Sequence, residues 1–381
     1  MYKGIYTTMS TIKHARTLVA GVILLLTLVV LSSCGFPGIV STAAQLPTVK
    51  NTAASTSQLP PVRFPQDEAA HTDLTEWWYY TGHMNTTDAN GKPHIYGFEL
   101  VIFQALRSNF PPVYASHFAI SDVTRGEFHY DQRRLLEPNA LIPNGTSMKG
   151  IDVSVGDWTI QGLNGLDHLS ANMPNYTMHI DLRGLKAATL HNGTGLINYG
   201  LGGFSYYYSR TRMALSGTLL DHNQSKTVTG EAWMDHQWGN FLSLGGGGWD
   251  WYSIQLSNNT EMMLYFIHDA SGATISTYAG YIDAEGKDHL LPTSSLHSTV
   301  LDHWTSSVTK ATYPSGWRLD INDPQVRVSL TITPQLKDQE LVVYQSTGNS
   351  YWEGAVNIQG QSNGKAVQGQ GYIELTGYAH G

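Results

Sequence analysis

The sequence predicts an all-β protein built from two barrel- or sandwich-type domains. Its 381 residues include 38 Gly and 21 Tyr but only 14% charged side chains, a composition that favours strands over helix bundles. From about residue 66 onward, short apolar runs alternate with Gly, Asn, Asp and Pro, as strands alternate with turns. The best helix candidate, from Leu296 to Trp304, is ambiguous because of its β-branched residues. The chain is long enough for two domains of ordinary size.

Charge and motifs exclude several classes of function. The 22 Lys and Arg against 30 Asp and Glu give a formal net charge of −8, and no long basic stretch is present to follow a phosphate backbone, so no nucleic-acid role is expected. The string Gly203-Phe204-Ser205-Tyr206-Tyr207 lacks the second glycine of a hydrolase nucleophile elbow. The 16 His are scattered without a His-x-x-x-His pair or cysteine partners, so no dedicated metal site is expected.

The first element, residues 1–33, is expected to be a lipoprotein signal peptide. Basic residues precede an apolar run from Leu18 to Leu31, which is short for a membrane span and typical of a secretory leader. The run ends in Leu31-Ser32-Ser33-Cys34-Gly35, which resembles the lipobox of bacterial lipoproteins, with Cys34 as the lipidated residue. This predicts a protein held at the cell membrane by a lipid anchor, on the extracytoplasmic side. An uncleaved anchor or an ordinary signal peptide is the alternative.

The next elements are a tether and two domains. Residues 34–65 are rich in Ser, Thr, Ala and Pro and are expected to form a flexible tether. The domains are expected at 66–244 and 245–381, because Gly245 to Gly248 is a four-glycine run that suits a joint. The expected strands include Gly97–Gln104, His117–Val123, Tyr176–Leu182, Tyr206–Gly217, Tyr252–Leu256, Glu261–Ile267, Val326–Pro334 and Gly371–Gly377.

A dense aromatic cluster, Glu76-Trp77-Trp78-Tyr79-Tyr80, opens the first domain. In a strand, Trp77 and Tyr79 point to one face, while Glu76, Trp78 and Tyr80 point to the other. A carboxyl group among aromatic faces has a raised pKa and becomes a usable acid. The alternative is that the aromatic residues fill a barrel and Glu76 binds a backbone amide or an arginine.

A second cluster places Asp235 and His236 between Trp233 and Trp238. An imidazole, a carboxylate and indole walls that exclude water suit general acid–base catalysis. In a strand, His236 and Trp238 share one face, and Asp235 faces the other side with Trp233 unless a bulge intervenes. The string Trp249-Asp250-Trp251-Tyr252 repeats the pattern of an acid between indoles. The alternative is a structural Asp and His that fix a corner of the fold.

Together these strings resemble the family of carotenoid 1,2-hydratases (hydroxyneurosporene synthases) and their AttH-like secreted relatives. The matching strings are Glu76 to Tyr79, Tyr114 to Asp122, Tyr207 to Arg212, Gly230 to Gly239, Tyr313 to Trp317, Tyr351 to Val356 and Gly369 to Tyr378. They span the chain from about residue 65 to its end. The resemblance implies two lipocalin-like (calycin) β-barrel domains with a ligand cavity in or between them. It also implies no metal or organic cofactor.

The resemblance further implies an acid-catalysed addition of water to an apolar, isoprenoid-like alkene, or a related hydrolysis. The expected catalytic residues are Asp235, His236 and Glu76; His236 and Trp238 match the family's His-x-Trp, and Asp235 is the expected proton donor or orienting partner. The expected substrate-binding residues are Trp77, Trp78, Trp238, Asp250, Trp251, Tyr252, Tyr265, Asp269, His117 and Tyr208.

These expectations describe one apolar chamber, walled by indoles, into which the His236 imidazole projects. Indole faces there would shelter a carbocation. The expected partner is therefore an apolar small molecule. Two hypotheses stay open: a hydratase-type enzyme, or a lipocalin-type lipoprotein that binds an apolar ligand without chemistry.

Overall fold

The computed structural model describes residues 59–87, 90–107, 110–136, 150–199, 203–241 and 247–379. The predicted signal peptide, Cys34 and most of the predicted tether lie outside the described residues. The described helices are the short 3-10 elements η2 Gln66–Glu68, η3 His191–Gly193 and η5 Thr293–Ser295. In this described part, no helix has the length and hydropathy of a membrane span. All other regular structure in it is β, so the all-β prediction is confirmed.

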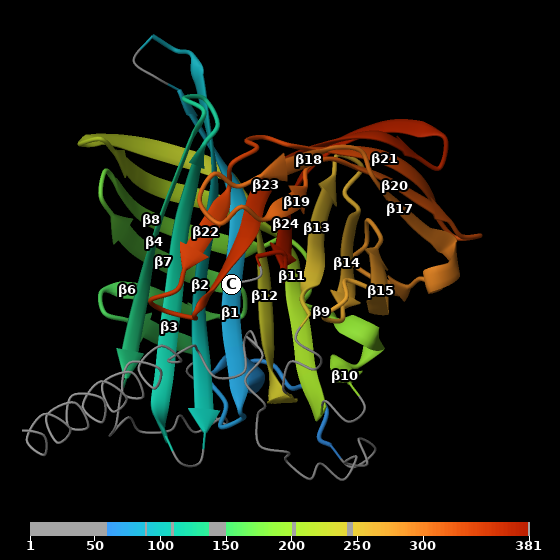
Figure 1. The fold of residues 1–381 in the computed structure, drawn as a ribbon, viewed down its shortest axis with the longest axis horizontal. Helices are drawn as coiled ribbons and strands as arrows, with labels where there is room; N and C mark the ends of the chain where they lie inside the picture. The colour runs from blue at the N-terminus through green and yellow to red at the C-terminus, as the bar shows by residue number, and fades with distance from the viewer. Residues whose placement is uncertain are drawn as a thin grey trace, which may run out of the picture. The chain divides into compact units, whose positions relative to one another are not determined.

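The first half of the body is one antiparallel sheet that closes almost into a barrel (Figure 1). Its strand order is β4-β3-β2-β1-β12-β11-β8-β7-β6-β5, with β9 and β10 paired to β11, and β5 approaches β3 and β4 at the opposite end of that order. The strands are β1 Thr75–Thr87, β2 Pro93–Arg107, β3 Phe110–Asp122, β4 Glu127–Leu136, β5 Ile151–Val155, β6 Trp158–Leu163, β7 Leu166–Met173, β8 Tyr176–Gly184, β9 Thr189–Leu190, β10 Leu196–Asn198, β11 Gly203–Asp221 and β12 Gln224–Phe241.

The second half forms another antiparallel sheet, drawn in yellow to red in Figure 1. Its order is β16-β15-β14-β13-β24-β23-β21-β20-β17, with β22 paired to β23, and β18 and β19 form a separate hairpin. The strands are β13 Trp249–Leu256, β14 Glu261–His268, β15 Thr274–Ile282, β16 Asp288–Leu290, β17 Leu296–Val300, β18 His303–Thr305, β19 Thr312–Pro314, β20 Trp317–Asn322, β21 Arg327–Pro334, β22 Glu340–Val343, β23 Asn349–Ser362 and β24 Lys365–Thr376.

The observed strands contain or overlap every strand predicted from the sequence. The ambiguous segment from Leu296 to Trp304 contains β17 and the start of β18 rather than a helix, and its β-branched Thr299 and Val300 pair with β20. The chain passes from the first sheet to the second between Phe241 and Trp249, around the predicted glycine joint.

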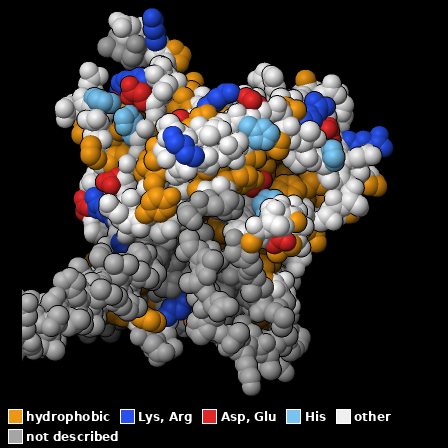
Figure 2. All heavy atoms as spheres, in the orientation of Figure 1, with side chains coloured by type: hydrophobic (Ala, Val, Ile, Leu, Met, Phe, Trp, Pro, Cys, Tyr) orange, Lys and Arg blue, Asp and Glu red, His pale blue; other side chains and the backbone are white. Residues whose placement is uncertain are grey.

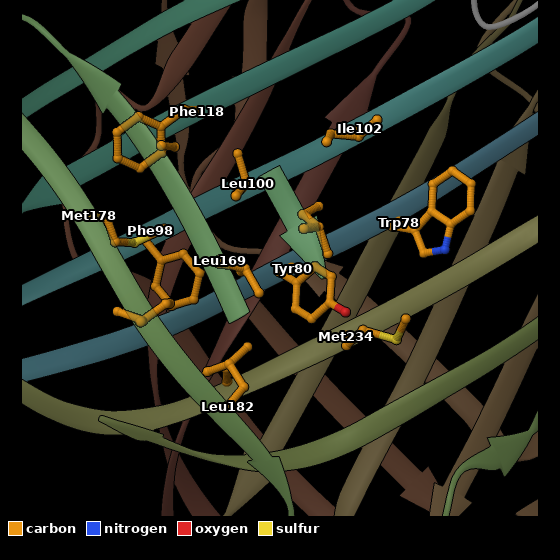
Figure 3. Packing of buried hydrophobic residues seen from close by; sticks show 14 of the residues in the cluster. Trp78, Tyr80, Phe98, Leu100, Ile102, Phe118, Leu169, Met178, Leu182 and Met234 are labelled. Atoms are coloured by element: carbon orange, nitrogen blue, oxygen red, sulfur yellow. The ribbon is translucent and has the colours of Figure 1, made fainter. Parts of the chain in front are cut away.

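Alternation along β1 selects the side chains that fill the barrel. Trp78 and Tyr80 project inward and meet apolar side chains from β2, β3, β7, β8 and β12, as Figure 3 shows. Both side chains are fully buried. Burial of a large apolar side chain stabilises a fold by roughly 1.5–3 kcal/mol, so this interior supplies much of the barrel's stability.

The outer face of β1, β2 and β12 is also buried, because the second sheet packs against it. Trp233 of β12 belongs to one apolar cluster with Trp251 and Tyr372 of the second sheet. Gly97 permits the close approach: a Cβ there would lie 2.8 Å from the Ala355 Cβ and would also overlap the Tyr372 hydroxyl. Both faces of this part of the barrel wall are therefore interior.

The packed body begins before residue 66. Leu59 and Val62 pack against the barrel core. The Phe64 ring meets the Tyr208 ring edge-on at 4.9 Å. Residues 59–65 therefore lie on the barrel rather than in the predicted tether, because their apolar side chains find partners there.

Charged side chains are dispersed over the surface that Figure 2 draws. On that face, Lys and Arg side chains are scattered among Asp, Glu and His rather than joined into a stripe. Inside the molecule, Arg210 pairs with Glu68, and Arg212 bridges Glu231 and Glu261. Both arginines are therefore ion-pair partners of acids from other segments of the fold.

Candidate active site between the two sheets

A pocket of about 420 Å³ lies between the outer face of the barrel and the second sheet. Its walls come from β1, β2, β10, β11 and β12 on one side and from β13, β14, β15 and β24 on the other. The aromatic side chains that line it are Trp77, Tyr79, Phe103, Tyr199, Tyr207, Phe241, Trp249, Trp251 and Tyr265. The polar ones are Asn198, Asp235, Gln237, His268, Ser276 and Glu374. Apolar walls with a few polar groups are typical of small-molecule sites.

Asp235 is the buried acid on the barrel side of this pocket. Its Oδ2 accepts a hydrogen bond of 2.7 Å from the Tyr207 hydroxyl. Its Oδ1 accepts one of 2.7 Å from the Trp233 indole N–H and another from the Ser209 hydroxyl. Burial raises the pKa of Asp235 to about 6, although these three donors oppose the rise. The carboxyl group is thus fixed in position and changes protonation close to neutral pH.

Glu374 is the acid on the opposite wall. It lies on β24, where it pairs with Trp251 of β13, and its Oε2 accepts a 2.8 Å hydrogen bond from the Trp249 indole N–H. Burial, assisted by the nearby Glu99 and Asp235 carboxylates, raises its pKa to about 8. Near neutral pH the pocket therefore combines a carboxylic acid, Glu374, with a carboxylate, Asp235.

A different cluster surrounds His236 on the inner face of the barrel wall. Oε1 of the fully buried Glu76 accepts hydrogen bonds of 2.8 Å from His71 Nδ1 and from His236 Nε2. Although burial opposes it, the Glu76 carboxylate raises the pKa of His71 to about 9. Burial lowers the pKa of His236 to about 4, so this imidazole is neutral. The cluster is a charged His71–Glu76 pair bonded to a neutral His236.

Aromatic rings enclose His236 as the sequence led us to expect. The ring centroids of Trp78 and Trp238 lie 4.9 and 4.7 Å from that of His236, and the Tyr208 hydroxyl lies 3.3 Å from its Nδ1. None of these side chains lines the pocket. The predicted split of faces is confirmed, with Asp235 bonded to Trp233 on the other side of the sheet. The single chamber expected around His236 is corrected, because neighbouring residues of a regular strand point to opposite faces.

The predicted substrate-binding residues divide in the same way. Trp77, Trp251 and Tyr265 line the pocket. Asp250 and Tyr252 point to the opposite face of β13, where Asp250 accepts a 2.9 Å hydrogen bond from the Tyr378 hydroxyl and Tyr252 packs in the core of the second sheet. Alternation along β13 thus separates Trp251 from both of its neighbours.

Two further predicted residues lie outside the pocket lining. Asp269 is in the turn after β14, where its Oδ1 accepts hydrogen bonds of 2.8 and 3.1 Å from the Ser271 and Ala273 amides. His117 is buried, with Nδ1 2.6 Å from the Tyr351 hydroxyl and Nε2 2.9 Å from the Ser346 hydroxyl. Asp269 therefore holds a turn, and His117 links the two sheets.

Some pocket residues were missed by the sequence interpretation. Trp249 and Gln237 could have been found, since each is two positions from a residue assigned to the site and shares its face. Glu374 lies in the matching string Gly369 to Tyr378, but its place in the wall depends on how β24 pairs with β13 and β23. We see no signal in the sequence that would have identified Tyr199.

Within the described ranges, two groups of side chains have ligand atoms close enough together to hold a metal ion: His71 with Glu76 and His236, and His94 with Asp122 and Asp221. The first group is already hydrogen-bonded internally, and Arg125 and Lys226 bind the carboxylates of the second. We assign neither as a metal site, because the oxygen atoms already have hydrogen-bonding or cationic partners. The expectation that the protein uses no cofactor remains a prediction.

The chain is similar to known proteins along most of its length. The family described as AttH-like matches residues 55–378. Kievitone hydratase of Fusarium solani subsp. phaseoli is 26% identical over 313 residues, which cover 78% of this chain and 81% of that protein. A crystal structure described as AttH from Nitrosomonas europaea is similar with a TM-score of 0.73 and 30% identity, over 87% of this chain and 99% of that one.

A crystal structure of kievitone hydratase from Nectria haematococca shares the fold, with a TM-score of 0.66 and 20% identity over 90% of this chain and 99% of that one. These similarities confirm the AttH-like part of the resemblance stated above and the lipocalin-like fold that it implied.

Proposed function

The chain belongs to the AttH-like family, and we propose that it is a hydratase-like enzyme that adds water to a carbon–carbon double bond of an apolar, isoprenoid-like substrate. The observation that carries the proposal is the pocket between the sheets, where aromatic walls surround two carboxyl groups, Asp235 and Glu374, with different affinities for a proton. The similarity to a kievitone hydratase supports the reaction class.

Hydration of an alkene needs three things from a protein. An acid must protonate one alkene carbon, the resulting carbocation must be sheltered, and water must be delivered to it as a base takes up one of its protons. Indole faces stabilise a nearby cation by about 0.5–2 kcal/mol each, and Trp77, Trp249 and Trp251 line the pocket. The proton lost by the acid equals the proton gained by the base, so the sum of the steps is addition of one water molecule.

In this proposal the chemistry takes place on the outer face of the barrel wall. Asp235 keeps the proton-transfer role expected from the sequence, because it lines the pocket. Glu76 and His236 instead stabilise the barrel interior, since their polar atoms are bonded to one another.

Heavy-oxygen labelling tests the proposed function. Lipophilic molecules that copurify with the protein are identified by mass spectrometry, and the complex is then incubated in water enriched in heavy oxygen. Incorporation of the label into the ligand, without cleavage of its skeleton, is the expected result for a hydratase. A ligand that stays bound and unlabelled would contradict the proposal and favour a lipocalin-type carrier.

We also propose that Cys34 carries a lipid that anchors the protein on the extracytoplasmic side of a membrane, based on the leader and the string around Cys34. Cys34→Ser is expected to abolish incorporation of labelled palmitate and to move the protein from the membrane to the soluble fraction. Ser33→Ala keeps a small residue before the cysteine and is expected to behave like the wild type. Equal membrane retention of Cys34→Ser would refute the anchor.

A further inference from the structure

We propose that Glu374 is the proton donor of the pocket, that Asp235 is the base that accepts a proton from water, and that Glu99 is a positioning residue that keeps Glu374 protonated. This inference rests on the proposed function and assigns its acid and its base. It stands on the geometry of a carboxyl cluster between the two sheets.

The strand register places Glu374 in this cluster. Glu374 on β24 lies directly opposite Glu353 on β23. Side chains directly opposite each other on antiparallel strands have Cβ atoms about 4.5–5.5 Å apart, so the two carboxyl groups are neighbours. The Trp249 indole N–H fixes Oε2 of Glu374 at the pocket wall. Glu374 thus connects the pocket with the acids behind it.

Tyr79 connects Glu353 with a third acid, Glu99 of β2. The Tyr79 hydroxyl oxygen lies 3.0 Å from Glu353 Oε2 and 3.2 Å from Glu99 Oε1. A phenol has one proton and cannot donate to both carboxyl groups at once. Glu99 Oε1 also accepts a 2.8 Å hydrogen bond from the Tyr351 hydroxyl. Both contacts of the Tyr79 hydroxyl are hydrogen bonds only if Glu99 or Glu353 is itself protonated and donates to the phenol oxygen.

The other oxygens of these two carboxyl groups also indicate that the cluster holds a proton. Glu99 Oε2 and Glu353 Oε1 are buried and have no hydrogen-bond partner among the described residues. An ionised oxygen without a donor is costly in the interior, whereas a neutral carboxyl group is tolerated more easily. The cluster is therefore built to retain protons.

The charged groups around Glu374 also favour a protonated carboxyl group there. Among the described residues, the titratable groups near Glu374 include Glu353 and Tyr351 on β23, Glu99 on β2, Asp235 on β12, Tyr79 on β1 and His268 on β14. No Lys or Arg is among the described residues that line the pocket. Burial and the neighbouring carboxylates raise the pKa of Glu353 well above its ordinary value, and burial raises that of Glu99.

The surroundings of Asp235 favour the ionised form more than those of Glu374 do, because its carboxylate accepts hydrogen bonds from Tyr207, Ser209 and Trp233. Pairs of acids whose environments separate their pKa values divide into a donor and a base. In the proposed step, the Glu374 proton forms a C–H bond as the alkene π bond breaks, water bonds to the cation, and Asp235 takes the proton that this water loses. After product release, Asp235 returns one proton to pocket water and Glu374 takes one up.

The donor role is tested with the isoprenoid alkene myrcene as probe and the full-length chain. Glu374→Gln is expected to lower kcat by about 10²–10⁴-fold, as for loss of a general acid. The exposed Glu285→Gln is the matched control and should have the activity of the wild type.

Wild-type kcat/KM should decline above about pH 8, where Glu374 ionises. Glu99→Gln should move that decline to lower pH, because one carboxylate that raises the pKa of Glu374 is gone. Full activity of Glu374→Gln would overturn the assignment.

Proton retention is tested without any substrate, by urea unfolding between pH 5 and pH 8. A raised carboxyl pKa means that the folded state binds more protons than the unfolded state, so the free energy of unfolding falls as pH rises through this range. Glu374→Gln should reduce this fall in the free energy of unfolding, whereas Glu285→Gln should keep it. A fall that is the same in both variants overturns proton retention by the cluster.

If wild type leaves myrcene unhydrated, the proposed function and the donor role fail, while the unfolding series still decides whether the cluster retains its protons.

Discussion

Asp235→Asn is expected to reduce kcat by about 10²–10⁴-fold, the usual effect of removing a group that transfers a proton in the transition state. The amide cannot accept the proton that water loses when it attacks the carbocation. Affinity for the apolar ligand should change by only about 1–2 kcal/mol, because the aromatic walls that bind it remain. Label incorporation from heavy-oxygen water measures the first effect, and tryptophan fluorescence titration measures the second.

Asp181→Asn is the matched control for this prediction. Asp181 lies on β8, where its side chain is two-thirds exposed and meets His168, away from the pocket. This variant should retain wild-type turnover, since exposed pairs contribute little to stability. Turnover by Asp235→Asn within a fewfold of wild type would show that Asp235 is not the base.

Glu76→Ala is expected to lower the free energy of unfolding by about 3–5 kcal/mol, the usual cost of removing one partner of a buried ion pair. The substitution leaves the buried His71 without its closest carboxylate and removes the hydrogen-bond partner of His236. Urea unfolding at neutral pH measures the change. Glu231→Ala removes a half-exposed partner of Arg212 and should cost no more than about 1 kcal/mol. A similarly small loss for Glu76→Ala would refute a structural role for this cluster.

The same cluster predicts a pH dependence of stability. His71 and other partners hold the pKa of Glu76 below its ordinary value even though burial opposes them, so its contribution is present at neutral pH and is lost as pH falls through the folded-state pKa. The pKa of His71 is raised to about 9, so its contribution is complete below its ordinary pKa of 6.5 and is lost as pH rises through 9. Glu76→Ala should remove most of both effects.

Local sequence determined the strands, the faces of their side chains and the family. The alternation of apolar and polar residues gave the strands, and the period of two assigned Trp77 and Tyr79 to one face of β1 and Trp78 and Tyr80 to the other. The same rule separated Asp235 from His236. The matching strings gave the family, because they carry side-chain identities that a strand pattern alone does not require.

Only the tertiary structure decided which face carries the pocket. Both faces of β1 and β12 are buried and aromatic, so their sequences do not distinguish the face that fills the barrel from the face that meets the second sheet. Glu374 enters the site through the pairing of β24 with β13 and β23, and Tyr79 meets Glu353, which is far away in the sequence. Alternation is a property of neighbouring residues, whereas strand register and sheet packing depend on contacts between distant segments. The sequence therefore identified Asp235 but not Glu374, the second acid of the pocket.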